Sequence, residues 1–479
     1  MNFGKHQNLK LKYKLNYKIK KMVKKNTSGN EKLKAQARRH SIKEGMFATM
    51  QASFGGHYIS PFAIAINTSS SLVAMLGSIS GLLGPMSQLF SSRLIEKYPR
   101  KKIILKAVLL ETLMWIPLIL VAFLFMNNII TNLLPLILLL SFALHIIFAN
   151  IAGPAWFSWM GDIIDEHKRG AYFSKRNLLT GFVSIVLAIS ASFFLDFFKT
   201  LNWTMAGFIV LFTLAFIGRL TSWKIFQGQY EPKIKLKKGY YFSFTEFLIN
   251  APKNNFGKFA IFRACLGFAS AISGPLLAVY LLRNLQFSYK TYMIIIFAGT
   301  IFSLLVIELW GKFADKYGNY KVLALTSIFI PLIPLAWILS SNIIYLFFVP
   351  SIIGGMSWAG FNLAATNFIY DNVSSDKRGL AVSYYNMLVG IGVFLGAGTG
   401  ALLIKFLNTT VIEPIVLIFL IGTVARMLVA FFGITKIKEI RQTKKLSKNT
   451  FKHLILKEAK PTLVEEAHQI MSIKDYLTE

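Results

Sequence analysis

Cysteine and acidic residues are both scarce in this chain. A single cysteine among 479 residues excludes a disulfide framework and a cysteine-based metal cluster. Only 21 Asp and Glu accompany 53 Lys and Arg, and the acids inside apolar stretches, Glu111 and Glu308, lie far apart in the sequence. No paired carboxylates, metal-ligand spacing or nucleotide-binding signature are present. We therefore expect no enzymatic activity, no bound metal, no cofactor and no direct ATP drive.

Apolar residues, in contrast, are abundant: they make up 54% of the chain, and the mean hydropathy is +0.53. Stretches of about 20 apolar residues recur, each long enough to cross a ~30 Å hydrocarbon core as a helix. Helices satisfy their backbone hydrogen bonds internally, as lipid requires. The sequence thus predicts an all-α integral membrane protein with twelve transmembrane helices, at 45–66, 71–92, 103–126, 132–160, 172–196, 204–226, 258–282, 290–311, 321–340, 343–370, 379–405 and 412–435.

The basic residues are concentrated in alternate segments between the apolar stretches. If the N-terminus is inside the cell, few of them fall in segments on the outer face: Lys199, Arg283, Lys290 and Lys405. Because Lys and Arg are retained on the cytoplasmic side, we predict a multi-pass protein of the cell membrane with both termini cytoplasmic. The first 44 residues are basic and lack an apolar core, so no cleavable signal peptide is expected.

The N-terminal tail alternates apolar and mostly basic residues from Leu9 to Ile19. Such a segment could lie on anionic lipid headgroups, at about 1 kcal/mol per basic residue near the surface. The alternative is a solvated, disordered tail that only retains topology. Without a folded nucleic-acid-binding domain, any contact of the basic tails with nucleic acid would be nonspecific.

Two basic motifs each occur twice, in the same order. Lys168-Arg169-Gly170 recurs 209 residues later as Lys377-Arg378-Gly379, and the segment 93–98 is echoed 219 residues later by 312–317. A duplicated chain of this kind predicts two parallel-related six-helix halves with a cleft between them. The predicted segments are a basic cytoplasmic tail, a first half, a central cytoplasmic loop, a second half and a cytoplasmic tail, at 1–44, 45–227, 228–257, 258–435 and 436–479.

The loop after the eighth stretch reads Gly311-Lys-Phe-Ala-Asp315-Lys-Tyr-Gly318-Asn-Tyr-Lys321. It resembles the signature of the major facilitator superfamily, in which a glycine is followed by aspartate, a basic residue, a second glycine and further basic residues. The copy after the second stretch has serine, glutamate and Pro99 at the corresponding places. The resemblance covers about residues 44 to 435. It implies the superfamily fold and solute transport by alternating access, with a small-molecule substrate and a monomeric protein.

The resemblance also implies that the motif loops act as a conformational latch on the cytoplasmic face. An acid at a helix end is attracted to the positive N-terminus of a neighbouring helix by ~0.3–1 kcal/mol, and nearby bases can form charge-assisted bonds. Ordinary topology-setting loops without a switching role are the alternative. The expected latch residues are Glu96, Lys97, Arg100, Asp315, Lys316, Gly318, Arg169 and Arg378.

Charges within the apolar stretches are costly and are usually paired or functional. Glu111 and Arg219 should lie at similar depth in neighbouring helices of the first half, so we predict an intramembrane ion pair between them. Arg426 is the repeat equivalent of Arg219, and its partner is less clear: Glu308 could pair with Arg426 or with Arg263. We favour structural pairing over proton coupling. The eleventh stretch also has glycines at four-residue spacing (Gly392, Gly396 and Gly400), which permit close helix contact; its twin has Leu187 in place of Gly396.

In the superfamily, the first and fourth helices of each half line the central cavity. Polar side chains on these helices would cost free energy if they faced lipid, so we expect them to face the cavity. Each one alone is more often a helix-packing residue. His57 and His145 could carry protons, but a neutral packing role is more common for such histidines. The predicted substrate-cavity residues are Gln51, His57, Tyr58, His145, Trp156, Ser270, Ser273, Trp358 and Asn362.

The leading functional hypothesis is a secondary active transporter of a small organic solute. An exporter or flippase of lipids or lipophilic compounds is an alternative, favoured by 14% aromatic residues. A non-transporting membrane sensor is another. Substrate, direction and coupling ion do not follow from the sequence, because one fold supports many specificities.

Overall fold

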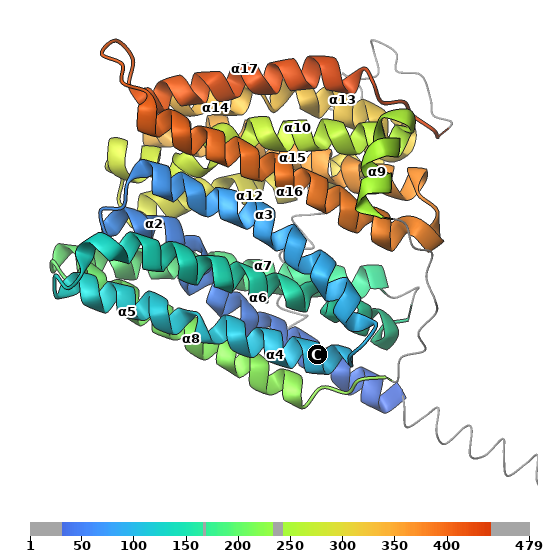
Figure 1. Ribbon diagram of the computed structural model, residues 1–479, viewed down its shortest axis with the longest axis horizontal. Helices are drawn as coiled ribbons and strands as arrows, with labels where there is room; N and C mark the ends of the chain where they lie inside the picture. Colours follow the sequence, from blue (N-terminus) through green and yellow to red (C-terminus); the bar gives the residue numbers. More distant parts are fainter. Residues whose placement is uncertain (1–30, 166–168, 233–242, 442–479) are drawn as a thin grey trace, which may run out of the picture.

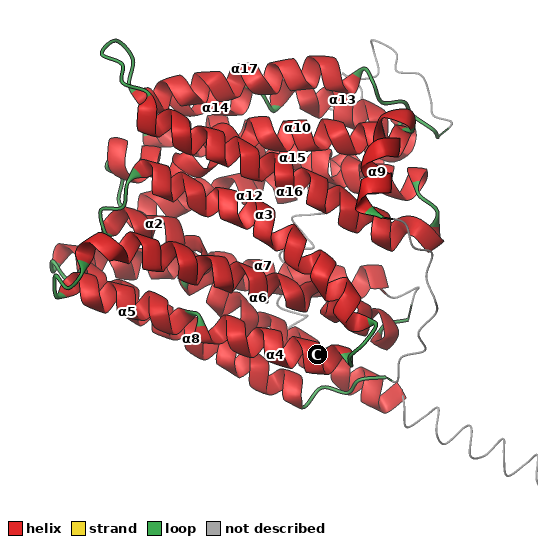
Figure 2. Ribbon diagram, viewed as in Figure 1, coloured by secondary structure: helices red, strands yellow, loops and turns green. Residues whose placement is uncertain are grey.

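A computed structural model describes residues 31–165, 169–232 and 243–441 (Figure 1). Within these ranges the regular structure is helical (Figure 2). Eleven helices of the described residues are long and apolar enough to cross a membrane. Each coincides with one of the predicted stretches from 71–92 onwards, and the ends differ by a few residues. The prediction of an all-α membrane protein is confirmed.

The helices form two halves. The first contains α3 (Ser70–Ile95), α4 (Arg100–Leu113), which continues as α5 (Trp115–Met126), α6 (Leu134–Ile163), α7 (Arg169–Thr200) and α8 (Thr204–Gln227). The second contains α10 (Asn255–Ser273), which continues to Asn284 through short helical turns, α12 (Tyr289–Tyr317), α13 (Asn319–Phe329), α14 (Leu332–Ile338), α15 (Ile343–Asn372), α16 (Ser375–Phe406) and α17 (Pro414–Ile434).

The first predicted span is interrupted. Residues 31–54 are helical, a turn follows, and a 3₁₀ turn (Gly56–Tyr58) leads into α2 (Ile59–Ala65). A Cβ on Gly55 would lie 2.1 Å from the Trp115 ring, so this close approach requires glycine. This segment is not among the eleven, and a total of twelve spans stays a prediction with which the structure is compatible. The chain is already helical at residue 31, inside the predicted tail.

The predicted central loop, 228–257, contains a short helix, α9 (Phe244–Asn250), whose N-terminus is capped by the Ser243 hydroxyl. The sequence did not predict this helix. The alternating segment 9–19 and most of the predicted C-terminal tail lie outside the described residues.

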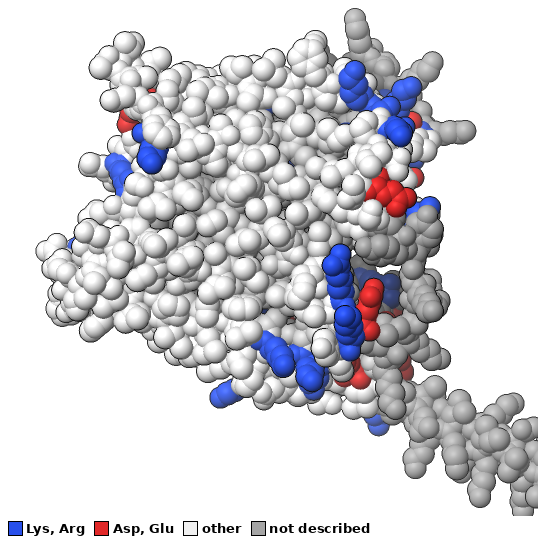
Figure 3. Space-filling model, in the orientation of Figure 1, with Lys and Arg blue, Asp and Glu red and all other residues white. Residues whose placement is uncertain are grey.

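The two halves lie side by side and pack mainly through two helix pairs, α3 with α16 and α7 with α12 (Figure 1). Contact between α3 and α16 is close, since a Cβ on Gly390 would lie 2.3 Å from the Gly81 carbonyl oxygen. Lysine and arginine side chains gather at one end of the visible surface (Figure 3). We call this the basic end; α3 ends there and α4 begins there. The other end is called the far end.

Candidate functional site

A cluster of charges is buried in the first half. Arg219 on α8 donates from Nη2 and Nε to the Glu111 carboxylate on α4, at 2.6 and 3.0 Å. Its Nη1 also lies 3.7 Å from Glu44, on the first helix. Both carboxylates are 2% exposed, so the pairing offsets the cost of burying three charges together. The two residues predicted to form an intramembrane pair are in contact in the structure.

The cluster extends towards the middle of the molecule. Arg176 on α7 lies 3.3 Å from Glu44, and its guanidinium stacks over the Trp156 ring at 4.4 Å. Further along, Gln51 and His145 are hydrogen-bonded through side-chain nitrogens 3.0 Å apart. The Trp156 Nε1 and the His145 Nδ1 are buried without a hydrogen-bond partner in the described structure. Such groups are normally satisfied by a ligand or by water.

The second half has an arginine at the repeat-equivalent place but no carboxylate beside it. Arg426 on α17 donates to the carbonyl oxygens of Ser270 (3.0 Å) and Ile330 (3.4 Å). Residue 330 follows Glu111 by the 219-residue repeat interval, so isoleucine occupies the place of the acid. Arg263 also stacks over a tryptophan, Trp358, at 5.4 Å. Among the described residues, no acid lies within ion-pair distance of Arg263 or Arg426.

The remaining predicted cavity residues lie in different surroundings. His57 is exposed and meets Phe297 of the other half edge to face, with ring centroids 5.2 Å apart. Asn362 is exposed, and the Ser270 hydroxyl is buried without a partner in the described structure. Tyr58 and Ser273 are buried inside their own halves, where Tyr58 donates to the Ala188 carbonyl oxygen and Ser273 contacts Arg426.

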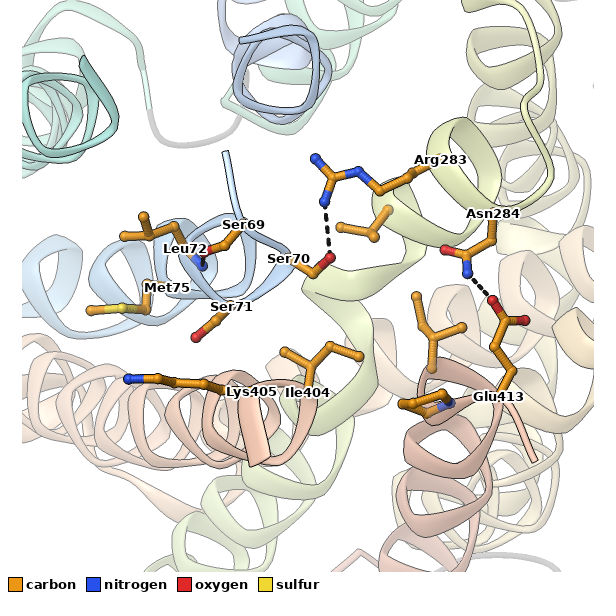
Figure 4. Close-up of a pocket in the computed structure, with 13 residues that line it drawn as sticks. Ser69, Ser70, Ser71, Leu72, Met75, Arg283, Asn284, Ile404, Lys405 and Glu413 are labelled. Carbon is orange, nitrogen blue, oxygen red and sulfur yellow. Dashed lines mark hydrogen bonds between the residues drawn. The ribbon is translucent and has the colours of Figure 1, made fainter. Parts of the chain in front are cut away.

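Polar contacts join the halves at the far end. Asp196, at the end of α7, accepts hydrogen bonds from the backbone N–H groups of Tyr289 and Lys290, both 2.9 Å, and so caps α12 of the other half. Arg283 donates to the Thr68 carbonyl oxygen at 2.7 Å and to the Ser70 hydroxyl at 3.0 Å (Figure 4).

A shallow pocket of about 720 Å³ lies beside the Arg283 contact and includes Ser71, Lys405 and Glu413 (Figure 4). Glu413 accepts a hydrogen bond from the Asn284 amide, and Ser71 donates to the Ala401 carbonyl oxygen at 2.8 Å. Deeper in, Ser78 donates to the Phe394 carbonyl oxygen, also at 2.8 Å. Within the described residues, these hydrogen bonds between the halves thus lie between the far end and the middle of the helices.

Comparison with known proteins places this architecture. The Major Facilitator Superfamily family model matches residues 45–251 and 259–469. The chain belongs to the Major Facilitator Superfamily. "Multidrug resistance protein 2" of Bacillus subtilis (strain 168) is 26% identical over 147 residues, which cover 30% of this chain and 36% of that protein. The chain therefore matches little more than a third of the length of this curated relative.

Solved structures of superfamily-type transporters share the fold. A mutant of the nucleoside transporter NupG is 15% identical, with a TM-score of 0.62 over 85% of this chain and 100% of that one. A bacterial homologue of the iron transporter ferroportin, in its inward-facing state, is 14% identical, with a TM-score of 0.63 over 84% and 98%. Its outward-facing state is matched with a TM-score of 0.57 over 84% and 99%, at 13% identity. The chain is a multi-pass membrane transporter of this superfamily.

The paired superfamily motifs make matching contacts within each half. Arg169 donates to the carbonyl oxygens of Gly161 and Ile164, at the end of α6. Arg378 donates to those of Tyr370 and Val373, at the end of α15, the same positions one repeat later. A cation at a helix C-terminus satisfies carbonyls that have no helical partner and interacts favourably with the helix dipole. In this state both arginines cap the preceding helix.

Arg100, predicted for the latch, is 1% exposed and holds the first half together. It donates to Asp162 at the end of α6, 2.7 Å away. In the second half Asn319 replaces this arginine and donates to Asp371, also at 2.7 Å. The resemblance of the two loops therefore reflects a shared contact between the third and fourth spans of each half.

The acids of the motif loops are placed differently. Glu96, Lys97 and Asp315 are exposed, and within the described residues neither carboxylate accepts a hydrogen bond. Lys316 lies over the Tyr317 ring. Gly318 has φ +96°, which favours glycine, whereas Pro99 occupies the same place before α4 with φ −56°. This difference accounts for the divergence of the two motif copies at that position.

Sequence reasoning missed three residues of the site: Glu44, Asp196 and Arg283. Glu44 was counted in the N-terminal tail, and its signal is helical spacing, because Glu44 and Gln51 lie seven residues apart on one face. Arg283 was expected only as one of the few basic residues on the outer face, and no role was predicted for Asp196. Nothing in the sequence says that they meet the opposite half.

Proposed function

We propose that this protein is a secondary active transporter that moves a small organic solute by alternating access between its two halves. The observation that carries the proposal is the set of contacts between the halves, which gather at the far end through Asp196 and Arg283. The higher TM-score to the inward-facing than to the outward-facing ferroportin homologue supports a state closed at that end. Breaking the far-end contacts and closing the basic end would complete the cycle.

The proposed orientation puts the basic end in the cytoplasm of a cell-membrane protein, with Lys and Arg retained inside. In that orientation the described state faces inward. The exposed acids Glu96 and Asp315 are then free to form the proposed latch only when the basic end closes. No step of this cycle needs a covalent intermediate, so we propose a non-enzymatic transporter.

We place the solute between Trp156 of the first half and Trp358 of the second. Trp156 Nε1 and His145 Nδ1 of the first half and Ser270 Oγ of the second are buried without a hydrogen-bond partner in the described structure, and we assign them as the groups that bind the solute's polar atoms. Asn362, on the same helix as Trp358, and Gln51 and His57, from the interrupted first span, add polar groups. Aromatic faces with a few hydrogen-bonding groups suit a small organic molecule.

Export of a lipophilic compound is the second candidate. The partial match to Multidrug resistance protein 2 and the aromatic rings at Trp156, Phe157 and Phe173 favour it, since flat apolar compounds bind such surfaces. The Glu44–Arg219–Glu111 cluster already pairs its charges, which favours a structural over a proton-coupling role.

The experiment is ligand-induced thermal stabilisation of the purified protein across nucleosides, sugars, amino acids, organic acids and lipophilic cations. A ligand at ~100 times its dissociation constant stabilises the folded state by ~2.7 kcal/mol. We expect one class to stabilise the wild type, with the effect lost in Trp156→Ala and Trp358→Ala. Trp203→Ala, at an exposed position before α8, is the matched control. Stabilisation that survives both cavity substitutions would contradict the proposed site.

A further inference from the structure

An apolar groove runs down the outside of the second half, between α10 and α17. It has a volume of about 500 Å³, within the ~300–1,000 Å³ range of ligand sites. Its walls include Ile261, Leu428 and Phe432, which are exposed at the surface of the bundle. This surface belongs to helices that cross the membrane, so it faces lipid rather than water.

Two lysines lie at the end of this groove. Lys258 lies in the first turn of α10, and Lys436 comes just after α17 ends. Both are at the basic end, where helices leave the hydrocarbon core and lipid phosphates lie. The described structure has no carboxylate within ion-pair distance of either ammonium group.

The position of Lys436 is fixed by the chain that follows it. Asn255, at the start of α10, donates to the Lys438 carbonyl oxygen at 2.9 Å and accepts from the Lys438 N–H at 3.0 Å. Ile437, which lies between Lys436 and Lys438 in the sequence, is 2% exposed and packs into the core of the protein. The segment after α17 is therefore held against the start of α10, which keeps Lys436 beside the groove that Lys258 also lines.

The groove extends from these lysines towards the middle of the membrane. Cys265 also lines it, seven residues after Lys258 on α10 and thus about 10 Å deeper along the helix. The site therefore combines positive charge at headgroup depth with an apolar channel below it. An anionic phospholipid has the complementary arrangement, with a phosphate above an acyl chain.

We propose that the α10–α17 groove binds one anionic phospholipid, with the phosphate between Lys258 and Lys436 and an acyl chain along Phe432 towards Cys265. The occupant comes from the bilayer and not from solution. Binding there ties α10 to α17 on the surface of the second half, independently of any transported solute.

Cys265 provides the test, because it is the only cysteine of the chain. The wild type is reconstituted into nanodiscs of phosphatidylcholine with or without phosphatidylglycerol, and its labelling by a membrane-permeant maleimide is timed. We expect slower labelling with phosphatidylglycerol, because a bound acyl chain covers the thiol. Each basic residue near an anionic surface contributes about fivefold, so Lys258→Gln/Lys436→Gln should lose about 30-fold of the lipid preference. Lys258→Arg/Lys436→Arg should keep most of it.

The matched control is Lys106→Gln/Lys224→Gln, which removes two exposed lysines from the first half and should label like the wild type. Native mass spectrometry gives a second readout: the Lys258→Gln/Lys436→Gln variant should retain one anionic lipid fewer. Equal labelling in both lipids would overturn the proposal. So would protection that persists without the two lysines, an unchanged lipid count, or equal protection by inorganic phosphate in neutral nanodiscs.

Discussion

The two halves of this transporter share one helical scaffold but stabilise it differently. In the first half, Arg219 is paired with Glu111 and lies near Glu44, so the buried charges neutralise one another. In the second half, Arg426 bonds to carbonyl oxygens, and Ile330 lies where an acid would be. The two halves therefore share the position of the arginine but not the groups that offset its buried charge.

Helix packing differs in the same way. Gly392, Gly396 and Gly400 bring α16 against α10, where a Cβ would lie 2.0–2.2 Å from the carbonyl oxygens of Phe268, Ala264 and Ile272. In the first half, Ser53 and Tyr58 instead hydrogen-bond to α7, and Leu187 replaces the central glycine. One half relies on backbone contact and the other on side-chain hydrogen bonds.

Removing one buried charge from the first half should lower the free energy of unfolding more than any other change proposed here. Glu111→Ala leaves Arg219 buried with only the more distant Glu44, and losing one partner of a buried pair costs about 3–5 kcal/mol. Arg426→Met should cost less, because no buried carboxylate is left behind. Chemical unfolding of the purified variants in detergent compares them. Equal losses would show that the ion pair is not what distinguishes the first half.

Gly396→Leu should be the next most damaging change. It gives α16 the residue, Leu187, that the repeat-equivalent helix α7 has at this position. The new side chain would overlap the Phe268 carbonyl, and overpacking typically costs about 1–3 kcal/mol. Gly181→Ala on α7 has open space around its Cβ and serves as the control. Thermal unfolding measures both, and a Gly396→Leu protein as stable as the wild type would contradict the role of backbone contact.

Asp196→Asn should loosen the far end. Hydrogen bonds to a charged group are worth about 1.5–3 kcal/mol each, so weakening the α12 cap should raise the population open at that end by about tenfold or more. A Ser78→Cys reporter in a Cys265→Ser background, buried between α3 and α16, would then react faster with a water-soluble maleimide. Lys405→Gln alters the repeat-equivalent position and should leave the rate unchanged. Unchanged reactivity in Asp196→Asn would show that its hydrogen bonds to α12 do not hold the far end closed.

Asp315→Asn should have the smallest effect. If Asp315 forms the latch only when the basic end closes, its loss favours the state described here by about 0.3–1 kcal/mol. The Ser78→Cys reporter should then react up to about fivefold more slowly, and Glu96→Gln in the other half should act in the same direction. Reporter rates that rise in either variant would reverse the proposed direction of the latch.

The sequence predicted the helices well because hydropathy depends on composition alone, and lipid imposes the same length on every span. It predicted Glu111 and Arg219 as neighbours for the same reason, through matched depth. It could not predict that Arg100 turns inward to Asp162, because a basic loop looks the same whichever way each side chain points. Glu44 was missed because the first helix begins before the apolar run, and Asp196 because contacts between halves leave no periodic signal.

The uncompensated arginines give the second half an electrical property that the first lacks. Within the described residues, the first-half cluster pairs two arginines with two carboxylates, while Arg263 and Arg426 have none. A charge that crosses the whole membrane field gains about 2.3 kcal/mol per 100 mV. If the conformational change moved each of these arginines through a tenth of the field, voltage would bias it by roughly 0.5 kcal/mol per 100 mV. The membrane potential would thus act mainly on the second half, and transport would be voltage-dependent even for a neutral solute.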